Sequence, residues 1–466
     1  MLFSSISFLY YFLPCVLILY HIVPKRLKNK ALLLASLVFY AWGEPKYVFL
    51  MLFLILFSYV FGLLIEKHRQ DPWGKRYLSL SVTISLGTLG IFKYTDFFLE
   101  TFGTVTGLKI PPANIALPIG ISFYTFQLLS YTVDVYRGNV SAQKSIVSLG
   151  TYVSMFPQLI AGPVVRYSDI EKQLRERVQS YEKTLDGIQR FLIGLGKKIL
   201  ISNALGELCE IFRVSGEKSV VFFWVYAISF TLQIYFDFSG YSDMAIGLGK
   251  IFGFDFLENF NYPYISASIT EFWRRWHMSL GSWFRDYVYI PLGGNRVSRP
   301  RWYLNIFVVW FLTGLWHGAA LQFILWGLMF GVLLVIEKQW LLEKLSKAKI
   351  WNHIYVMLLV IISFVIFNAK DLGQAFSDLQ GMFGLRGLPF MSAECAYYLR
   401  SYLVLFAAAI LGATPLVRNL GVRFSGTGLG RKIMPVLRPV MLVALLAVCT
   451  AYLIDSSFNP FLYFRF

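Results

Sequence analysis

Long apolar segments separated by short polar loops make up most of this chain. Four of the longest run from Phe3 to Val23, Tyr47 to Ile65, Tyr77 to about Phe98, and Val436 to Ile454. Each is long enough to cross a hydrocarbon layer of roughly 30 Å as a helix. Counted along the chain, such segments predict an all-α polytopic membrane protein with about eleven transmembrane helices. We expect residues 1–466 to form a single membrane-embedded domain.

The loops between these segments carry most of the basic residues. They gather at Lys25 to Lys30, Lys67 to Arg76, Arg296 to Arg301 and Lys338 to Lys349. The positive-inside rule assigns such loops to the cytoplasm, which places the N-terminus outside. The first apolar segment has no basic region before it and is followed by Pro24, so it predicts a retained span rather than a signal peptide.

Three stretches interrupt this simple pattern. Ile146 to Val165 is apolar but is broken by Pro157, Gly162 and Pro163, which predicts a re-entrant or kinked element shielded by protein. Arg166 to Lys183 is rich in both charge signs and predicts a solvated cytoplasmic helix. Ala369 to Glu394 is expected to form a long external loop.

Composition supports the same class of protein. Hydrophobic residues make up 57% of the chain and aromatic residues 18%, and the mean hydropathy is +0.58. The net charge of +17 could suggest nucleic acid, but the basic residues lie between apolar segments, which favours attraction to anionic lipid. The four cysteines have no paired spacing, so we expect neither disulfides nor a metal site, and we expect these residues to contribute packing.

The stretch after Ser268 predicts a helix at the membrane surface. Ser268 and Glu271 have the form of a capping box. Indole and other apolar side chains then recur at helical spacing, while Arg274 and Arg285 share another face, as expected for an interfacial helix. His277 would stand one turn from Trp273 on this helix, either as a functional group or as an ordinary interfacial histidine.

A second histidine lies inside the next apolar segment. Tyr303 to Phe323 carries no charged residue and predicts a span. His317 is roughly 21 Å from a helix start at Tyr303, beyond the midplane of the layer. An ionisable group at that depth is a functional candidate. Gly314 and Gly318 leave room beside it, although they also fit a small-residue motif for helix packing, in which His317 would only bond a neighbouring helix.

Two carboxylates follow the span that runs from Val220 to Phe236. Asp237 and Asp243 are six residues apart, a spacing that does not bring them to one helix face, so a paired acid and base is not predicted. Structural hydrogen bonding is one role for them. Asp243 is also a candidate for orienting a histidine.

Five motifs resemble one family. They are RRWHMSLGSWFRDYVYIPLGGNR from Arg274, WHG from Trp316, DVYRG from Asp134, YFDFSGYSDMAIG from Tyr235, and NPFLYFRF from Asn459. The chain resembles the bacterial branch of the membrane-bound O-acyltransferases over essentially its whole length, and within it the members that acetylate alginate. Neither histidine departs from the family pattern.

The resemblance implies a site and a reaction. His317 would be the general base, or the nucleophile in a relay, and His277 a second catalytic or positioning residue. Histidine suits proton transfer because its pKa of about 6.5 leaves a neutral nitrogen available. The acyl donor would be acetyl-CoA, with no permanently bound cofactor. Arg274, Arg275 and Arg285 would meet its phosphates, unless they bind lipid headgroups instead.

The resemblance also implies partners and a location. It suggests a bacterial cytoplasmic (inner) membrane protein that works with an SGNH-type extracytoplasmic acetyltransferase and with polysaccharide synthesis machinery. One alternative within the family is D-alanyl transfer to teichoic acid from a carrier-protein thioester. A lipid or glycan transporter is another, since buried ionisable residues also mark translocation paths. A scaffold for a polysaccharide synthase is a third.

Overall fold

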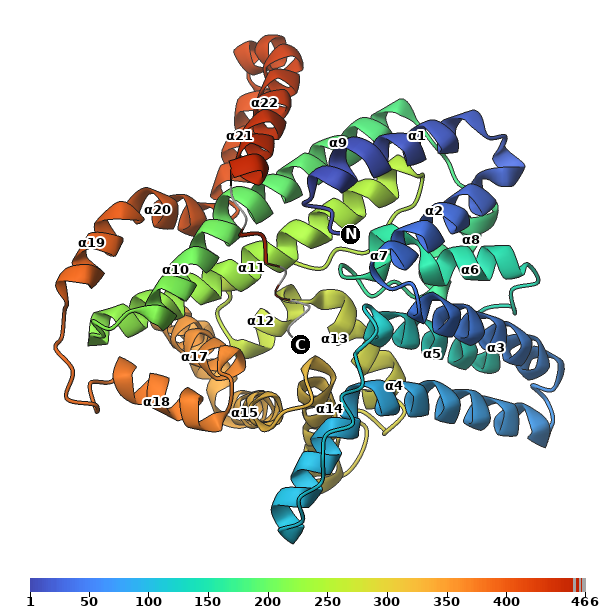
Figure 1. Cartoon of the computed structure of the whole chain (residues 1–466), viewed down its shortest axis with the longest axis horizontal. Helices are drawn as coiled ribbons and strands as arrows, with labels where there is room; N and C mark the ends of the chain where they lie inside the picture. Colours follow the sequence, from blue (N-terminus) through green and yellow to red (C-terminus); the bar gives the residue numbers. More distant parts are fainter. Residues whose placement is uncertain (456–457, 461, 463–466) are drawn as a thin grey trace. The chain divides into compact units, whose positions relative to one another are not determined.

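Helices and loops form the whole of the described chain in the computed structural model, which covers residues 1–455, 458–460 and 462 (Figure 1). No strand occurs among these residues, which confirms the all-α fold class. The chain separates into two compact units. The first comprises Met1–Phe191 with Tyr241–Leu257, and the second Leu192–Gly240 with Glu258–Phe466. Two of the three boundaries fall within helices, α9 and α11, and the third lies in the loop that follows α11.

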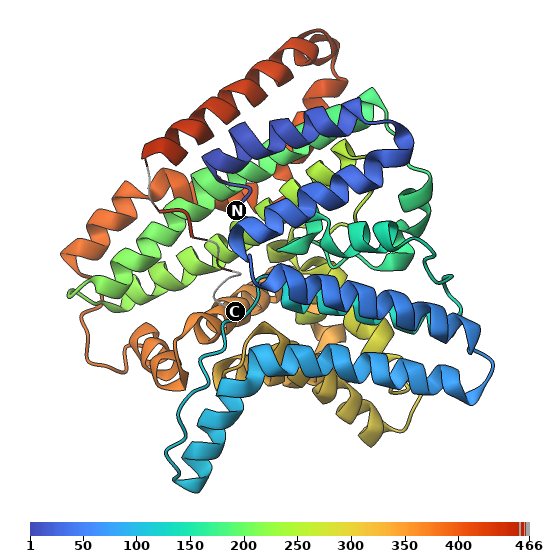
Figure 2. The ribbon, with the colours of Figure 1, turned by 45° about the vertical axis from the view of Figure 1, so that its right-hand side comes forward.

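The first unit contains the N-terminal helices. They are η1 (Ser7–Phe12), α1 (Leu13–Ile22), η2 (Lys25–Leu27), α2 (Lys28–Gly43), α3 (Tyr47–Lys67), α4 (Pro72–Thr106), α5 (Ile121–Arg137), α6 (Ile146–Ser154), α7 (Phe156–Leu159), α8 (Tyr167–Arg175) and the first part of α9 (Tyr181–Gly196). The helices predicted at Tyr47 and Tyr77 are confirmed, and α3 and α4 lie side by side (Figure 2). Helix α4 is longer than predicted because polar residues extend it at both ends.

The stretch from Ile146 to Val165 is broken as its prolines predict. Helix α6 ends at Ser154, and the short α7 follows with Pro157 in its first turn. The four side chains of α7 are buried, and the backbone N–H of Phe156 donates to Ser36 Oγ at 3.1 Å. Protein therefore shields this irregular backbone. The charged stretch that follows is two helices rather than one, since α8 ends at Arg175 and α9 begins at Tyr181.

The second unit contains the remaining helices. They are the end of α9, η3 (Lys197–Asn203), α10 (Ala204–Val214), the part of α11 (Val220–Ile251) up to Gly240, η4 (Pro263–Ile265), α12 (Ile269–Arg275), α13 (Met278–Phe284), η5 (Arg285–Tyr289), α14 (Arg299–His317), α15 (Leu321–Ile336), η6 (Glu337–Leu341), α16 (Leu342–Lys347), α17 (Trp351–Asn368), α18 (Leu372–Met382), α19 (Ala393–Ser401), α20 (Leu403–Gly412), α21 (Leu416–Gly426) and α22 (Gly428–Asp455). The external loop expected from Ala369 to Glu394 is wrong in part, because an amphipathic stretch within it folds as α18.

Helices α14 and α15 pack closely in the second unit (Figure 1). A Cβ added at Gly314 would lie 2.3 Å from the backbone oxygen of Phe323, and one at Gly327 would lie 2.3 Å from that of Trp310. Only glycine allows this approach. The surrounding core is aromatic and includes Trp276 and Trp326, both buried. Three of the four cysteines are also buried, as a packing role predicts, whereas Cys15 is exposed.

Five helical segments of the described chain are long and apolar enough to cross a membrane. They are Tyr47–Lys67, Val220–Ile251, Leu321–Lys347, Trp351–Asn368 and Gly428–Asp455. Helices α19 and α20 add a sixth if this pair, bent by 56°, forms one span. The count of about eleven stays a prediction, because the other apolar stretches are shorter or interrupted helices. The single-domain expectation likewise stays a prediction.

Candidate active site

The helix predicted after Ser268 is broken at His277. The start is as predicted, since Ser268 Oγ accepts the backbone N–H of Glu271 at 3.0 Å. Helix α12 then ends at Arg275, and α13 begins at Met278. Between them His277 adopts φ 45° and ψ 51°, a left-handed conformation that is uncommon for residues other than glycine. The prediction of a single interfacial helix is therefore wrong. Arg274 and Arg285 lie on different helices, so helical spacing no longer places them on one face.

A segment that begins at Asn259 stabilises this break. The backbone N–H of Asn261 donates to the carbonyl of Arg275 at 2.9 Å, and that of Met278 donates to the carbonyl of Asn259 at 3.0 Å. These bonds satisfy helix-end groups that a continuous helix would have paired internally. Neither glycine nor proline lies between Ile269 and Leu280, so the break left no signal in the sequence.

The side chain of Asn259 also sets the orientation of His277. His277 Nδ1 lies 3.0 Å from Asn259 Oδ1. The same oxygen accepts the backbone N–H of Ser279 at 3.4 Å and its hydroxyl at 2.9 Å. A backbone N–H is always a donor, so the amide oxygen of Asn259, not its nitrogen, faces this group. His277 Nδ1 must then carry the hydrogen, which leaves the lone pair on Nε2.

His277 is buried and neutral. Its side chain is 2% exposed, and Nε2 has no hydrogen-bond partner among the described residues. Burial, and secondly the charge on His317, lower the pKa of His277 well below its ordinary value. The ring of Phe238 lies edge-on at 4.6 Å. A buried nitrogen without a partner is costly unless a ligand or water supplies one.

His317 is the last residue of α14, where the chain turns into α15. Residues 318–320 are not helical, so the continuous span expected from Tyr303 to Phe323 is wrong. Helix α14 also begins at Arg299 rather than Tyr303. The depth predicted for His317 within the membrane was counted from Tyr303 and therefore no longer follows. Its side chain is 8% exposed. The ring centroids of Trp326 and Phe367 lie 5.1 and 5.3 Å from its own, both nearly perpendicular to it.

The glycines beside His317 do not leave open space. A Cβ at Gly318 would lie 2.2 Å from the ring of Phe323, and one at Gly314 would meet the backbone oxygen of the same residue. The first turn of α15 therefore fills the room that the sequence suggested. These glycines serve helix packing, the alternative that the small-residue motif left open.

The two histidines meet at the indole of Trp316. The ring centroid of Trp316 lies 6.0 Å from that of His277 and 5.0 Å from that of His317. At this separation the charge on His317 disfavours protonation of His277. The structure thus brings together two residues that are forty positions apart in the sequence.

Buried indole N–H groups near this pair lack acceptors within the described chain, and we consider the two on neighbouring rings. They belong to Trp273 and Trp326, whose ring centroids are 5.6 Å apart. Trp326 also contacts His317, as described above. Buried donors without acceptors and a buried acceptor without a donor therefore occur in the same aromatic cluster, which is a chemical environment suited to a polar ligand.

The three arginines predicted to meet phosphates differ in their surroundings. Arg275 pairs with Glu271 at 2.8 Å and also donates to the backbone oxygen of Asn261 at 3.1 Å. Arg285 pairs with Asp286 at 2.7 Å, which raises its pKa. Arg274 is exposed on α12 and is the least engaged of the three. Their phosphate-binding role stays a prediction.

The carboxylates of α11 have structural partners. Asp243 pairs with Arg190 at 3.0 Å in the first unit, so the candidate role of Asp243 in orienting a histidine is not supported, and Asn259 is the partner of His277 instead. Asp237 forms a buried ion pair with Lys198 at 2.5 Å and accepts the backbone N–H of Leu462 at 3.1 Å. Part of the C-terminal motif is thus anchored, while residues 461 and 463–466 lie outside the described residues.

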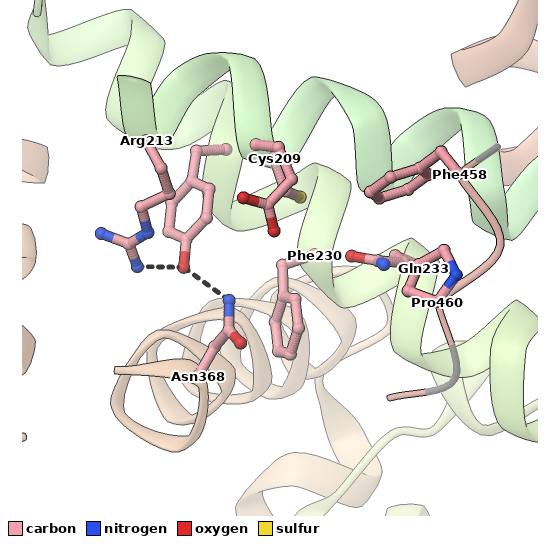
Figure 3. Close-up of a pocket in the computed structure, with 9 residues that line it drawn as sticks. Cys209, Arg213, Phe230, Gln233, Asn368, Phe458 and Pro460 are labelled. Carbon is pink, nitrogen blue, oxygen red and sulfur yellow. Dashed lines mark hydrogen bonds between the residues drawn. The ribbon is translucent and has the colours of Figure 1, made fainter. Parts of the chain in front are cut away.

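A cavity of ≈ 240 Å³ lies in the second unit, and Asn368, the residue after Phe367, is part of its lining (Figure 3). Figure 3 shows Phe230 between Asn368 and Gln233. Asn368 donates to the hydroxyl of Tyr226 at 2.7 Å and directly follows Phe367, which contacts His317. Gln233 is only 4% exposed, and its amide lines the cavity. The charged side chains of Glu210 and Arg213 also line the cavity. Charged, amide and hydroxyl groups beside aromatic rings suit a polar ligand that bears hydroxyl groups.

Comparison with known sequences agrees with these features. A family model described as MBOAT, membrane-bound O-acyltransferase family, matches residues 5–372. The chain is 38% identical to the probable alginate O-acetylase AlgI of Azotobacter vinelandii over the whole of both chains. It is 43% identical to the probable alginate O-acetylase AlgI of Pseudomonas aeruginosa, over 82% of this chain and 75% of the relative. It is 34% identical to the peptidoglycan O-acetyltransferase of Helicobacter pylori, over 86% of this chain and 83% of the relative.

Proposed function

Because the chain belongs to the membrane-bound O-acyltransferase family, we propose that it transfers an acetyl group from a cytoplasmic thioester for O-acetylation of an extracytoplasmic polysaccharide. The protein is an O-acyltransferase and a multi-pass membrane protein. The names of its relatives, alginate O-acetylase and peptidoglycan O-acetyltransferase, support acetyl as the group and a polysaccharide as the acceptor class. The observation that carries the proposal is the buried histidine pair at Trp316.

Acetyl transfer needs a base and a site for negative charge. The acceptor hydroxyl attacks the thioester carbonyl, a C–O bond forms, the C–S bond breaks, and the proton passes from the hydroxyl through a histidine to the departing thiolate. We propose His317 as the base and His277 as the second histidine of the site. The low pKa of His277 suits this chemistry, because a neutral ring at its side does not repel the imidazolium that forms on His317.

The tetrahedral intermediate carries an oxyanion that must be stabilised by hydrogen-bond donors. The indole N–H groups of Trp326 and Trp273 are suitable donors, since both are buried and have no acceptor within the described chain. Their aromatic surroundings exclude water, which strengthens any hydrogen bond they make to the oxyanion. We propose that Trp326, which contacts His317, is the principal donor.

The donor and the acceptor would reach the histidines by different routes. We propose acetyl-CoA as the donor, with Arg274 the first of the three arginines to meet its phosphates, because Arg275 and Arg285 are already paired with carboxylates. The cavity lined by Gln233 and Asn368 is our candidate for the acceptor side, because Asn368 adjoins the Phe367 ring beside His317. An SGNH-type acetyltransferase outside the cytoplasmic membrane would then receive the acetyl group or guide the polysaccharide.

The test uses purified protein in sealed proteoliposomes that receive acetyl-CoA, labelled in the acetyl group, on one side only. The acceptor polysaccharide and the partner acetyltransferase are supplied on the other side. We expect consumption of the thioester to match the label recovered in O-acetyl ester. A transporter would move its substrate without consuming thioester. Consumption of a D-alanyl carrier protein, with acetyl-CoA left intact, would establish the teichoic acid alternative.

A further inference from the structure

We propose that Asn259 is a positioning residue that fixes the tautomer of His277, so that His277 presents an unprotonated Nε2 to the reacting groups. The inference rests on the proposed acetyl transfer but concerns a residue outside the histidine and arginine motifs. Asn259 itself would touch neither donor nor acceptor. Its effect would pass through the ring of His277.

The hydrogen bonds around Asn259 disfavour a flip of its side-chain amide. The residue is 1% exposed. Its oxygen faces three groups at once, namely His277 Nδ1 at 3.0 Å, the Ser279 hydroxyl at 2.9 Å and the Ser279 backbone N–H at 3.4 Å. A flipped amide would place its own N–H groups against that backbone N–H, and a buried donor left without an acceptor costs about 1–3 kcal/mol.

The backbone of Asn259 also stabilises the chain conformation next to His277. The carbonyl of Asn259 accepts the N–H of Met278, the first residue of α13. His277 lies directly before Met278 in the left-handed conformation. One residue therefore determines both the backbone break at which His277 sits and the ring nitrogen that carries the hydrogen. Such dual support suits a ring whose orientation matters for function.

A neutral amide has a consequence that a carboxylate would not have. A carboxylate bonded to Nδ1 stabilises the imidazolium and raises the pKa of the ring, whereas an amide oxygen fixes the tautomer with little such effect. Among the described residues, the titratable group that changes the pKa of His277 is His317. Its charge lowers the pKa of His277 further, beyond the effect of burial. His277 thus stays a hydrogen-bond acceptor as the pH falls into the range where a solvated histidine would be protonated.

The experiment compares Asn259→Asp and Asn259→Ala in the full-length protein. The aspartate keeps an acceptor oxygen for Nδ1 but stabilises the charged ring, so we expect the acidic limb of the pH profile of acetyl transfer to move to higher pH. The alanine removes the acceptor and frees the tautomer, and we expect a loss of about 10- to 100-fold in kcat, by analogy with groups that orient metal-bound histidines. Asn261→Asp and Asn261→Ala are matched controls, since this exposed residue of the same segment contributes backbone bonds only.

A second measurement reads the tautomer without any assay of activity. Nitrogen NMR of protein labelled in histidine, with His277 assigned by its substitution, should show the hydrogen on Nδ1 in the native protein and a mixture of tautomers in Asn259→Ala. A hydrogen on Nε2 in the native protein, or an unmoved acidic limb in well-folded Asn259→Asp, would overturn the inference. A native protein that transfers no acetyl group but shows the Nδ1 tautomer would instead overturn the proposed function.

Discussion

The Nδ1 atom of His277 lies 3.0 Å from the Oδ1 atom of Asn259, eighteen residues away in the sequence and joined to it at a break between two helices. This contact determines which nitrogen of a fully buried histidine is unprotonated. That nitrogen has no partner within the described chain and lies in the aromatic cluster that also holds His317. A buried acceptor of this kind is expected where substrate, not protein, supplies the missing donor.

The ring of His277 should be separable from its backbone role. Asparagine adopts the left-handed conformation readily, so His277→Asn should keep the break between α12 and α13 while removing Nε2. We expect the variant to fold and acetyl transfer to fall by about a hundred- to ten-thousand-fold. The measurement is the single-turnover rate of purified protein, with thermal unfolding as the control for folding. Nearly native transfer by this variant would remove His277 from the site.

Trp326 should contribute through its N–H rather than through its bulk. Trp326→Phe keeps most of the aromatic contact with His317 but removes the donor, and loss of one oxyanion donor typically lowers kcat by about a hundred- to a thousand-fold. KM should change little, because the oxyanion is absent from the bound substrate. Trp310→Phe is the matched control, since this buried tryptophan packs against Trp273 and has no role in our mechanism. Equal losses in the two variants would indicate packing instead.

Neutralising Arg274 should weaken donor binding. We expect Arg274→Gln combined with Arg285→Gln to raise KM for acetyl-CoA more than it lowers kcat, because phosphate contacts act equally on the ground and transition states. Most of the effect should come from Arg274, because Arg285 already pairs with Asp286. Steady-state kinetics of the single and double variants separates the two contributions. Parallel losses in kcat and in yield of folded protein would point to lipid anchoring or folding.

Gly314 should be essential to the packing of the helix that ends at His317. A methyl group there would meet the backbone oxygen of Phe323 at 2.3 Å, and backbone can yield only if the helices move apart. Overpacking of this kind typically costs about 1–3 kcal/mol, so Gly314→Ala should lower the unfolding temperature in detergent. Gly87→Ala is the control, since a Cβ at Gly87 would have no neighbour within 4 Å. Equal stability of both variants would contradict the close packing of α14 and α15.

The sequence predicted those features that depend on long runs of residues. Apolar length located helices such as α3 and the C-terminal α22, the prolines after Ile146 predicted a broken element, and the motif around His277 predicted the family. Each of these signals is local in the chain. They need no knowledge of which distant segments come into contact.

The remaining features depend on contacts between distant segments. The break at His277 comes from hydrogen bonds to Asn259 and Asn261, neither of which forms a recognisable motif with it. The end of α14 at His317 coincides with the packing of Phe323 into the space beside Gly314 and Gly318, where the sequence left both open space and helix packing as alternatives. Asp243 pairs with Arg190, which is the structural role that the sequence left open beside the orienting of a histidine, and His277 bonds to Asn259 instead.

The central claim is that His317 is the base for acetyl transfer, and His317→Gln tests it most directly. Glutamine can still form hydrogen bonds at the end of α14 but cannot accept a proton at neutral pH. The measurement is transfer of labelled acetyl from acetyl-CoA to the acceptor by purified, folded protein, with His21→Gln as a control at an exposed histidine of the first unit. We predict a loss of about a hundred- to ten-thousand-fold for His317→Gln and none for His21→Gln. A well-folded His317→Gln protein that retains a sizeable fraction of native transfer would contradict the assignment and leave His277 as the base.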